Sequence, residues 1–496
     1  MTISADELLA MCPDNYAALF RDRVAQSADR VAFLVPDLSG ASTEWSQLTW
    51  RQVADQVDEL SAGLIQLGLA AEERVAIVST TRIEWVLADL AIACAAGVTT
   101  TIYPNTHQDD MEHILRDSES VIAFVENQTQ LDKVLSLGQG SQRLRHIVAM
   151  DVAGVDAGSD PRIVTWQQLQ DAGRDYLASH PDCLGERLKL MMPDTLSTLI
   201  YTSGTTGLSK GVELTHRCWT YEAIALNWMN FVHEDDLLYL WLPLSHVFGR
   251  DLLAVQLGIG FSAAVDGRVD RIVQGMGEVR PTLLVGVPRI FEKVRAVVMT
   301  MSHGIRGQIS RWAFAVGRES RPYRLAGRPL PWAVRLRYGL AERLVFSRLK
   351  ASLGGRMRFM ISGSAKLSSQ VQEWFYSAGI TVVEGYGMTE TSAITCVNVP
   401  DVPRFGTVGP AIPGVELSIA DDNELLVRGP TVARGYHNLP EATAEAWRDG
   451  WLHTGDLGVL DADGYLTITD RKKDLIKTSN GKFVAPQVVE SVIMAN

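Results

Sequence analysis

Glycine, hydroxyl and amine groups are concentrated in the segment "TSGTTGLSKG", which follows the apolar run "TLIY". Apart from Leu208, every residue from Ser203 to Lys210 is Gly, Ser, Thr or Lys. Glycines let backbone amides approach an anion closely, hydroxyl groups donate hydrogen bonds to its oxygens, and Lys210 adds a mobile positive charge. The segment is not a Walker P-loop, because Ser209 stands where the glycine before the lysine would be needed. We therefore interpret it as a cradle for a polyphosphate, with a flexible polar surface loop as the alternative.

Strand and helix patterns alternate around this segment and must position it. Amphipathic helix patterns, such as Trp50 to Leu67, separate short apolar runs that are bounded by glycine or polar residues. We expect these runs to be strands, and they span 74–80, 121–126, 146–151, 198–203, 237–244, 282–288, 357–363 and 381–387. The alternation predicts an α/β fold with mainly parallel sheets over residues 1–400. From 401 to 469, short strands with Asp-Gly and Asp-Asn turns predict a distorted antiparallel β-barrel.

Length, charge and cysteine usage exclude several classes of protein. At 496 residues the chain is too long for one core, so two or more packed units are expected. The net charge of −12 argues against general nucleic-acid binding, which needs a basic face. The N-terminus lacks a secretory signal pattern, and no apolar run is long enough to span a bilayer. The five cysteines are far apart and predict reduced, mostly buried thiols in a cytoplasmic protein.

Four motifs in a fixed order carry a resemblance to a known family. They are "YTSGTTGLSKGVELTH", "EGYGMTET" at 384–391, "GWLHTGDLG" at 450–458 and "DRKKDLIK" at 470–477. Together they resemble the adenylate-forming, or AMP-binding, superfamily over nearly all of residues 15–490. Three further segments, "LPLSHVFGR", "VGVPRIFEKV" and "FMISGSAKL", are similar to the long-chain fatty acyl-CoA synthetases. The resemblance implies a large N-terminal domain of two α/β subdomains and a distorted barrel, followed by a hinge and a small C-terminal domain.

The resemblance also implies a ligation in two steps. A carboxylate is a poor electrophile, whereas its mixed anhydride with AMP has a good leaving group. The first step would convert a fatty acid and ATP, with Mg²⁺, into acyl-AMP and pyrophosphate, and the second would pass the acyl group to coenzyme A. Because the attack brings two anions together, the site must supply positive charge and hydrogen-bond donors.

Roles for individual residues follow from the same resemblance. Lys210 would grip the phosphates that become pyrophosphate, and Thr389 would donate to the α-phosphate. Glu390 would bind Mg²⁺ with the Thr202 hydroxyl as a helper, since Mg²⁺ prefers oxygen ligands. His246 would form a wall of the acyl pocket near the carboxylate, and Lys210, Glu390, Thr389 and His246 are the candidate catalytic residues. The nucleotide contacts would come from Thr202, Ser203, Gly204, Thr205, Thr206, Gly207, Gly363, Ser364, Ala365, Glu384, Gly385, Tyr386, Gly387, Met388, Asp456 and Arg471.

Four of these residues have ordinary alternative roles. Tyr386 offers a flat ring for adenine, but a core aromatic is the usual role of such a residue. Asp456 can accept both ribose hydroxyls and Arg471 can donate to ribose or phosphate, although each could be a turn or surface charge. His246 follows a strongly apolar strand, where a lone histidine is more often structural. Their places in the motifs favour the functional roles.

The sequence departs from the family pattern in two places. The implied hinge is 470–474, with Lys473 as pivot, and 475–496 would begin a C-terminal domain without a counterpart of the family's catalytic lysine. A shortened synthetase and a naturally short homologue both fit this pattern. We favour the first and expect slow acyl-AMP formation and little thioester from this chain alone. Arg250 stands where one bacterial branch has a tryptophan that gates the fatty-acid tunnel, so such a gate is in doubt.

Residues 306–358 form a basic region inside an acidic protein. They contain 13 Lys and Arg residues against two acids, with Trp and Phe interleaved. Ala333, Leu336, Leu340 and Leu344 fall on one face of the expected helix. Such a segment can lie on an anionic membrane surface, which would make the protein peripheral. A solvated helical face packed on the core is the alternative, and we favour it slightly.

Three other functions stay open at this point. The chain could hand its acyl-AMP to an acyl-carrier protein instead of coenzyme A. It could activate an aryl or amino acid, although the pocket segments offer no clear acidic anchor for an ammonium group. It could also be a non-catalytic protein that binds ATP or acyl-adenylates, and pyrophosphate exchange with a panel of acids would separate these functions.

Overall fold

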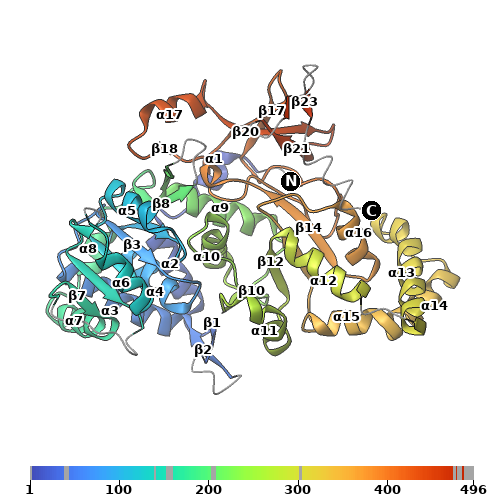
Figure 1. Ribbon diagram of the computed structural model, residues 1–496, viewed down its shortest axis with the longest axis horizontal. Helices are drawn as coiled ribbons and strands as arrows, with labels where there is room; N and C mark the ends of the chain where they lie inside the picture. The colour runs from blue at the N-terminus through green and yellow to red at the C-terminus, as the bar shows by residue number, and fades with distance from the viewer. Residues whose placement is uncertain are drawn as a thin grey trace.

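Two mainly parallel sheets, with helices between and around them, form the body of the structure (Figure 1). It is a computed structural model that describes residues 3–37, 44–138, 141–151, 160–202, 208–300, 304–472, 476–477 and 483–484. Each of the apolar runs expected to be strands contains one, and the prediction of an α/β fold is confirmed. A smaller antiparallel sheet lies across the top of Figure 1 and completes the architecture.

The first sheet carries the polyphosphate segment. Its eight strands lie in the order β18-β9-β8-β4-β3-β5-β6-β7. From β8 to β7 all neighbours are parallel, whereas β9 is antiparallel to both β8 and β18. The strands are β3 Arg74–Val78, β4 Val98–Ile102, β5 Ile122–Val125, β6 His146–Ala149, β7 Ile163–Thr165, β8 Leu196–Thr202, β9 Lys210–Thr215 and β18 Gly435–Tyr436. The helices of this lobe are α3 Trp50–Gln66, α4 Ile83–Cys94, α5 Gln108–Asp117, α6 Gln128–Leu135, α7 Trp166–Ser179 and α8 Cys183–Leu188.

The second sheet carries the "EGYGMTET" motif at the end of β14. Its eight strands lie in the order β15-β14-β13-β12-β10-β11-β1-β2, and all neighbours are parallel except at the two edges. The strands are β1 Val31–Pro36, β2 Trp45–Thr49, β10 Leu237–Leu240, β11 Ser262–Val265, β12 Leu283–Gly286, β13 Phe359–Ser362, β14 Thr381–Tyr386 and β15 Cys396–Val397. The helices that follow these strands are α11 Ile272–Val279, α12 Pro288–Thr300, α13 Gly304–Leu325, α14 Trp332–Ala341, α15 Ser347–Ser352 and α16 Ser369–Ser377.

Helices α9, His216–Met229, and α10, Val247–Ile259, lie between the two sheets (Figure 1). Every residue of α10 is buried, as expected of a helix that is packed on all sides. Its polar residues are therefore paired inside the protein. The Gln256 amide, for example, donates to the carbonyl oxygens of Ala32 and Phe261 at 2.9 and 3.1 Å. These bonds fix α10 to β1 and to the start of β11.

Two strand pairings join segments that are distant in the sequence. Strand β1 pairs with β11, so residues near the N-terminus complete the second sheet. Strand β18 pairs with β9 and brings a segment from the region predicted as barrel, 401–469, to the first sheet. Each of the two sheets is therefore built from segments that are separated in the sequence.

The antiparallel sheet and the chain that follows it complete the described structure. It consists of β16 Glu416–Ile419, β17 Glu424–Arg428, β19 Trp447–Arg448, β20 Trp451–Leu460 and β21 Leu466–Arg471. Helix α17, Pro440–Ala446, precedes β19, and the short pair β22 Ile476–Lys477 and β23 Phe483–Val484 follows. The predicted pivot Lys473 lies outside the described residues.

The remaining expectations from composition concern thiols and membranes. All five cysteines are free and four of them are buried, which confirms the prediction of unpaired, mostly buried thiols. Among the helices of the described part of the chain, none combines the length and apolar character needed to cross a bilayer.

Candidate active site

The hairpin β8–β9 brings the two ends of the polyphosphate segment together. Its register pairs Thr202 with Lys210, and both residues line a cavity of about 830 Å³. The Lys210 ammonium lies 5.0 Å from the centroid of the Tyr436 ring, a cation–π contact that steadies the charge at the cavity wall. The predicted phosphate contacts 203–207 lie outside the described residues.

Glu390 lies in a short 3-10 helix, Thr389–Thr391, after β14. Its side chain is buried and accepts a 2.7 Å hydrogen bond from the Tyr436 hydroxyl. Burial raises the pKa of Glu390, and the hydrogen bond from Tyr436 opposes this rise. The turn requires glycine at Gly387, because a Cβ there would lie 1.7 Å from the carbonyl oxygen of Ala393. The motif therefore builds a tight turn that places one buried acid at the cavity.

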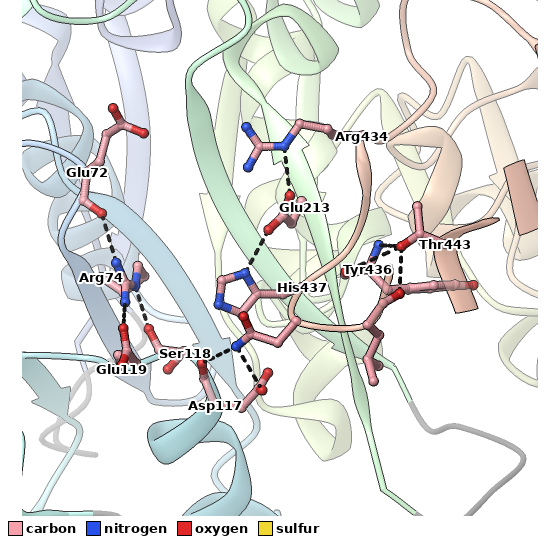
Figure 2. Close-up of polar contacts among 12 residues, drawn as sticks. Glu72, Arg74, Asp117, Ser118, Glu119, Glu213, Arg434, Tyr436, His437 and Thr443 are labelled. Atoms are coloured by element: carbon pink, nitrogen blue, oxygen red, sulfur yellow. Dashed lines mark hydrogen bonds and ion pairs between the residues drawn. The ribbon is translucent and has the colours of Figure 1, made fainter. Parts of the chain in front are cut away.

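The segment around strand β18 is fastened to the first sheet (Figure 2). This attachment places Tyr436 within hydrogen-bond distance of Glu390. The Glu213 carboxylate joins Arg434 and His437, at 2.7 Å each, on either side of Tyr436. The amide of Asn438 donates to Asp117 at 3.2 Å and ties the end of the segment to α5. No local pattern in the sequence marks Tyr436, because it is a lone tyrosine 46 residues from Glu390.

Tyr386, Asp456 and Arg471 meet at another wall of the same cavity. The Tyr386 hydroxyl donates to Asp456 Oδ2 at 2.7 Å, and Arg471 Nε lies 3.0 Å from Asp456 Oδ1. The register of β20 with β21 places Asp456 opposite Arg471. Burial and the Asp456 charge raise the pKa of Tyr386 well above its ordinary value, so the phenol stays protonated and donates. The two carboxylate oxygens of Asp456 and the Arg471 guanidinium thus lie together at the cavity, where a ribose and a phosphate could bind.

The other end of the cavity is apolar. Its side chains come from α9 and the segment after it, from α10 and the residue before β11, and from strands β12 and β13. They are Leu226, Phe231, Val232, Phe248, Leu252, Val255, Phe261, Leu283, Val285 and Ile361. One continuous cavity therefore offers hydrogen-bonding and charged groups at one end and hydrocarbon at the other.

His246 lies in the cavity lining, at the start of α10. Its Nδ1 accepts a 3.1 Å hydrogen bond from the backbone N–H of Phe248. Burial lowers the pKa of His246, so the ring is neutral near pH 7 and its proton is on Nε2. A neutral ring with one N–H can donate to a carboxylate without adding a fixed charge.

Comparison with known proteins places this geometry in a family. The family profile described as "AMP-binding enzyme" matches residues 20–437. The chain belongs to the AMP-binding enzyme family. It is 34% identical over 499 residues to the long-chain-fatty-acid–CoA ligase FadD15 of Mycobacterium bovis. The aligned region covers 97% of this chain and 78% of that protein. It is 30% identical over 515 residues to the long-chain-fatty-acid–CoA ligase ACSBG2 of Xenopus laevis, with coverage of 99% and 68%.

Solved structures of similar proteins have the fold of this AMP-binding enzyme. ATP-bound MatB from Rhodopseudomonas palustris matches with a TM-score of 0.71 and 25% identity, over 97% of this chain and 84% of that one. The anthranilate CoA ligase AuaEII in complex with anthranoyl-AMP matches with a TM-score of 0.70, over 98% and 83%. At 21% identity, that second likeness concerns the fold alone.

The structure gathers most of the predicted site residues of this AMP-binding enzyme around one cavity. Its lining includes Thr202, Lys210, His246, Gly363, Ser364, Gly385, Tyr386, Gly387, Met388, Thr389, Glu390, Asp456 and Arg471. Ala365 and Glu384 are described but do not belong to this lining. The residues 203–207 and Lys473 lie outside the described part of the chain.

The donor set suits a magnesium ion that enters with a nucleotide. Among the described residues, no group of three or more His, Cys, Asp or Glu side chains is placed to hold a metal ion. Glu390 supplies a buried carboxylate and Thr202 a hydroxyl at the same cavity. Mg²⁺ typically takes one or two carboxylates and fills its other positions with substrate phosphate oxygens and water. Glu390 and Thr202 therefore fit the ion only if a polyphosphate binds beside them.

Glu384 fastens the segment after β13 and does not face the cavity. Its carboxylate accepts a 2.7 Å hydrogen bond from the backbone N–H of Leu367 and another from the Gln372 amide. Burial raises the pKa of Glu384 to about 7, against the opposing effect of these hydrogen bonds. Since Gly363 and Ser364 in this segment line the cavity, Glu384 is a positioning residue.

Replacing Glu384 by glutamine is expected to flatten the dependence of stability on pH. Between pH 4.5 and about 7 the unfolded chain has lost the proton that folded Glu384 still holds, so wild-type stability falls as pH rises. The loss amounts to about 3 kcal/mol, since one pKa unit corresponds to about 1.4 kcal/mol. Urea-denaturation midpoints on both sides of pH 7 measure it. The variant should exceed wild type at the alkaline end, and parallel profiles would contradict the assignment.

Arg250 lies in the core and does not line the cavity. Its guanidinium carbon lies 4.2 Å from the Trp219 ring centroid and 4.8 Å from that of Tyr16. Arg250 Nη2 also lies 3.2 Å from Asp89 Oδ1, and both side chains are fully buried. Because the side chain is buried outside the cavity lining, position 250 supplies no tunnel gate in this structure.

A buried acid pair supports the turn that follows Glu390. Glu222 Oε1 accepts a 2.6 Å hydrogen bond from the backbone N–H of Ile394. Burial raises the pKa of both Glu222 and Asp251 well above ordinary values, and the charge of Asp251 adds to the effect on Glu222. Ala393 has a φ of 105°, which disfavours any residue with a side chain. The pair thus holds a strained turn against the cavity.

Lys472 is a second site residue that was not predicted individually. Its ammonium contacts Asp422 at 2.6 Å and Glu424 at 3.0 Å. Glu424 also accepts a 2.9 Å hydrogen bond from the backbone N–H of Gly455, directly before Asp456. The basic cluster "DRKKDLIK" gave a signal for this residue, but its partners lie in β17 and the turn before it. This network holds the end of β21 against the cavity.

Proposed function

We propose that this chain activates a fatty acid: it joins the carboxylate to AMP from ATP, releases pyrophosphate and then transfers the acyl group to coenzyme A. The observation that carries the proposal is the single cavity with nucleotide-type groups at one end and hydrocarbon at the other. The junction between the ends, near His246 and Thr389, is where a carboxylate and an α-phosphate would meet. ATP suits the polar and charged end of the cavity, and the hydrocarbon chain of a fatty acid suits the apolar end.

The residues at the junction suit an attack by one anion on another. Lys210 supplies a positive charge at the polyphosphate end, Thr389 a hydroxyl donor and His246 a neutral N–H donor. Donors that are fixed before the reaction stabilise developing charge without reorganisation. Mg²⁺ held by Glu390 and Thr202 would neutralise phosphate charge when MgATP binds. The protein thus orients the two reactants and lowers their repulsion.

A long acyl chain and coenzyme A as acceptor are the finer parts of this proposal. The relatives FadD15 and ACSBG2 both carry the name long-chain-fatty-acid–CoA ligase. The ten side chains at the apolar end of the cavity offer an environment for methylene groups, each of which gains about 0.8 kcal/mol on burial. An acyl-carrier protein as acceptor is the second candidate, since the adenylation half of the site would be the same.

ATP–pyrophosphate exchange by the full-length protein tests the proposal. The assay uses saturated fatty acids of graded length, with an aryl acid and a set of amino acids as competitors. Exchange that depends on fatty acids supports the proposal, whereas exchange only with amino or aryl acids, or with none, contradicts it. Acyl-thioester formation with coenzyme A, compared with an acyl-carrier protein, then decides the acceptor.

We also propose that α14 and the turns after it lie on an anionic membrane surface. Trp332, Leu336, Leu340 and Leu344 recur every four residues and are 76%, 70%, 50% and 42% exposed. The opposite face, which includes Val334 and Phe346, packs on the core. Helices α13 and α14 lie at the edge of the molecule (Figure 1). An exposed apolar row beside arginines suits a lipid surface better than water.

Charge neutralisation should release the protein from anionic vesicles. We expect that replacing Arg335, Arg337, Arg343 and Arg348 by glutamine weakens binding by about three orders of magnitude, since each basic residue contributes about 1 kcal/mol near such a surface. Sedimentation with phosphatidylserine-containing vesicles, and with purely zwitterionic ones, measures the effect. Glutamine at four exposed arginines elsewhere, Arg51, Arg145, Arg174 and Arg428, is the matched control. Equal binding by wild type and both variants would end the membrane proposal.

A further inference from the structure

A second cavity of about 390 Å³ adjoins the apolar end of the main cavity. It lies between α2, Tyr16–Ser27, the end of α9 and the end of α10. Val232 is the one residue that lines both cavities among those described. Val232 is 6% exposed and is therefore buried between the two linings.

The backbone on both sides of Val232 is fixed. Arg358 Nη2 donates to the carbonyl oxygen of Phe231 at 3.2 Å, and the backbone N–H of His233 donates to Asp236 Oδ2 at 2.9 Å. The Phe231 ring also contacts Phe359, with centroids 5.9 Å apart. These contacts hold the backbone on both sides of Val232 in place between the two cavities.

The opposite wall of the second cavity is also held in place. Buried Arg23 donates to the carbonyl oxygens of Leu257 and Gly258, at 2.8 and 2.9 Å, at the end of α10. The two cavities differ in chemistry. The acyl end of the first is hydrocarbon, whereas the second combines apolar side chains, such as Leu19 and Ile224, with charged and polar ones. The charged and polar residues are Asp22, Arg23, Gln26, Asn227, Asn230, His233 and Glu234.

We propose that Val232 is the far wall of the acyl pocket and sets the longest chain that the pocket accepts. Beyond it, the second cavity is a distal subsite that suits an acyl chain with a polar end, such as an ω-hydroxy acid, once the wall is reduced. A terminal methyl group gains little there, because the polar lining keeps water. A terminal hydroxyl group can instead bond with the amide side chains. The inference rests on the proposed function, since it assumes that the apolar end holds an acyl chain.

Three substitutions of Val232 test whether this residue limits the length of the acyl chain. Val232→Ala should extend the longest acid that supports pyrophosphate exchange, with a gain in kcat/KM of about fourfold for each methylene that enters the space left by the valine side chain. The gain should be larger for ω-hydroxy acids than for unsubstituted acids of equal length. Val232→Phe should abolish exchange with the longest wild-type substrates and spare short ones. Val232→Thr, which keeps the shape, should retain the wild-type length limit.

Ile224→Ala is the matched control, because Ile224 lines the second cavity alone. It should leave the length profile unchanged, and the KM for ATP should stay constant in every variant. An unchanged profile in Val232→Ala and Val232→Phe, or an equal shift in Ile224→Ala, would overturn the inference. Wild-type exchange with short fatty acids separates this outcome from failure of the proposed function, in which wild type would use no fatty acid at all.

Discussion

Glu390→Gln is expected to slow ATP–pyrophosphate exchange by about two to three orders of magnitude, as when one preorganised charge-stabilising group is removed. Glutamine keeps the shape of the side chain and can still accept the hydrogen bond from Tyr436. It removes the only formal charge that the Thr389–Thr391 turn presents to the cavity. The free energy of unfolding should stay equal or rise, because a buried carboxylate is replaced by a neutral group. Activity and stability therefore change independently.

The effect of the Glu390 charge can be separated from the effect of the hydrogen bond that orients its carboxylate. Tyr436→Phe removes the 2.7 Å hydrogen bond but leaves the carboxylate, so its effect on exchange should be smaller than that of Glu390→Gln. Affinity for ATP measured with and without Mg²⁺ gives a second readout. Wild type should gain affinity from the ion, and Glu390→Gln should gain much less. If both proteins gained equally, Glu390 would not hold the metal.

Arg250→Met should destabilise the protein by about 3–5 kcal/mol, the cost of leaving a buried charge without its partner. Asp89 would keep only the 2.7 Å hydrogen bond from Thr99 Oγ1. The cation–π contacts with Trp219 and Tyr16 would also be lost. A fall in the urea-denaturation midpoint measures the effect. At low temperature, where the variant is still folded, the fatty-acid length profile should match wild type, because Arg250 is not part of the cavity lining.

A double variant is the control for this prediction. Arg250→Met with Asp89→Asn removes both charges and should recover most of the lost stability, since the cost arises from the unpaired carboxylate. Arg250→Lys keeps the charge but not the planar group that stacks on the rings, and should be intermediate. If the double variant were as unstable as the single one, packing and not charge would account for the loss.

Local sequence patterns determined the strands, because a short apolar run bounded by polar residues has few other ways to bury its side chains. The strands β3, β5, β6, β8, β10, β12, β13 and β14 were predicted on this ground. Strand β4 was not, because its sequence "VTTTI" is rich in threonine. Its hydroxyl groups find partners only in the folded protein: Thr99 bonds with Asp89 and Thr101 with the carbonyl oxygen of Ser245.

The motifs likewise indicated which residues belong to the site but not how they are held. Gly387 is readable in the sequence, since only glycine fits a turn that tight. Glu384 is in the same motif, yet the structure turns it towards Leu367 and Gln372. Successive residues of a strand point to opposite faces. Which of them meet the cavity depends on the neighbouring strands and on what packs against each face.

The sequence by itself determined the element types, the order of the motifs and the chemical character of the residues they carry. Tertiary structure alone decided that β18 pairs with β9, that Tyr436 thereby reaches Glu390, and that Val232 separates two cavities. The physical reason is the range of the forces involved. Backbone sterics and side-chain periodicity act over a few neighbouring residues, whereas contacts between distant segments are selected by the packing of the whole chain.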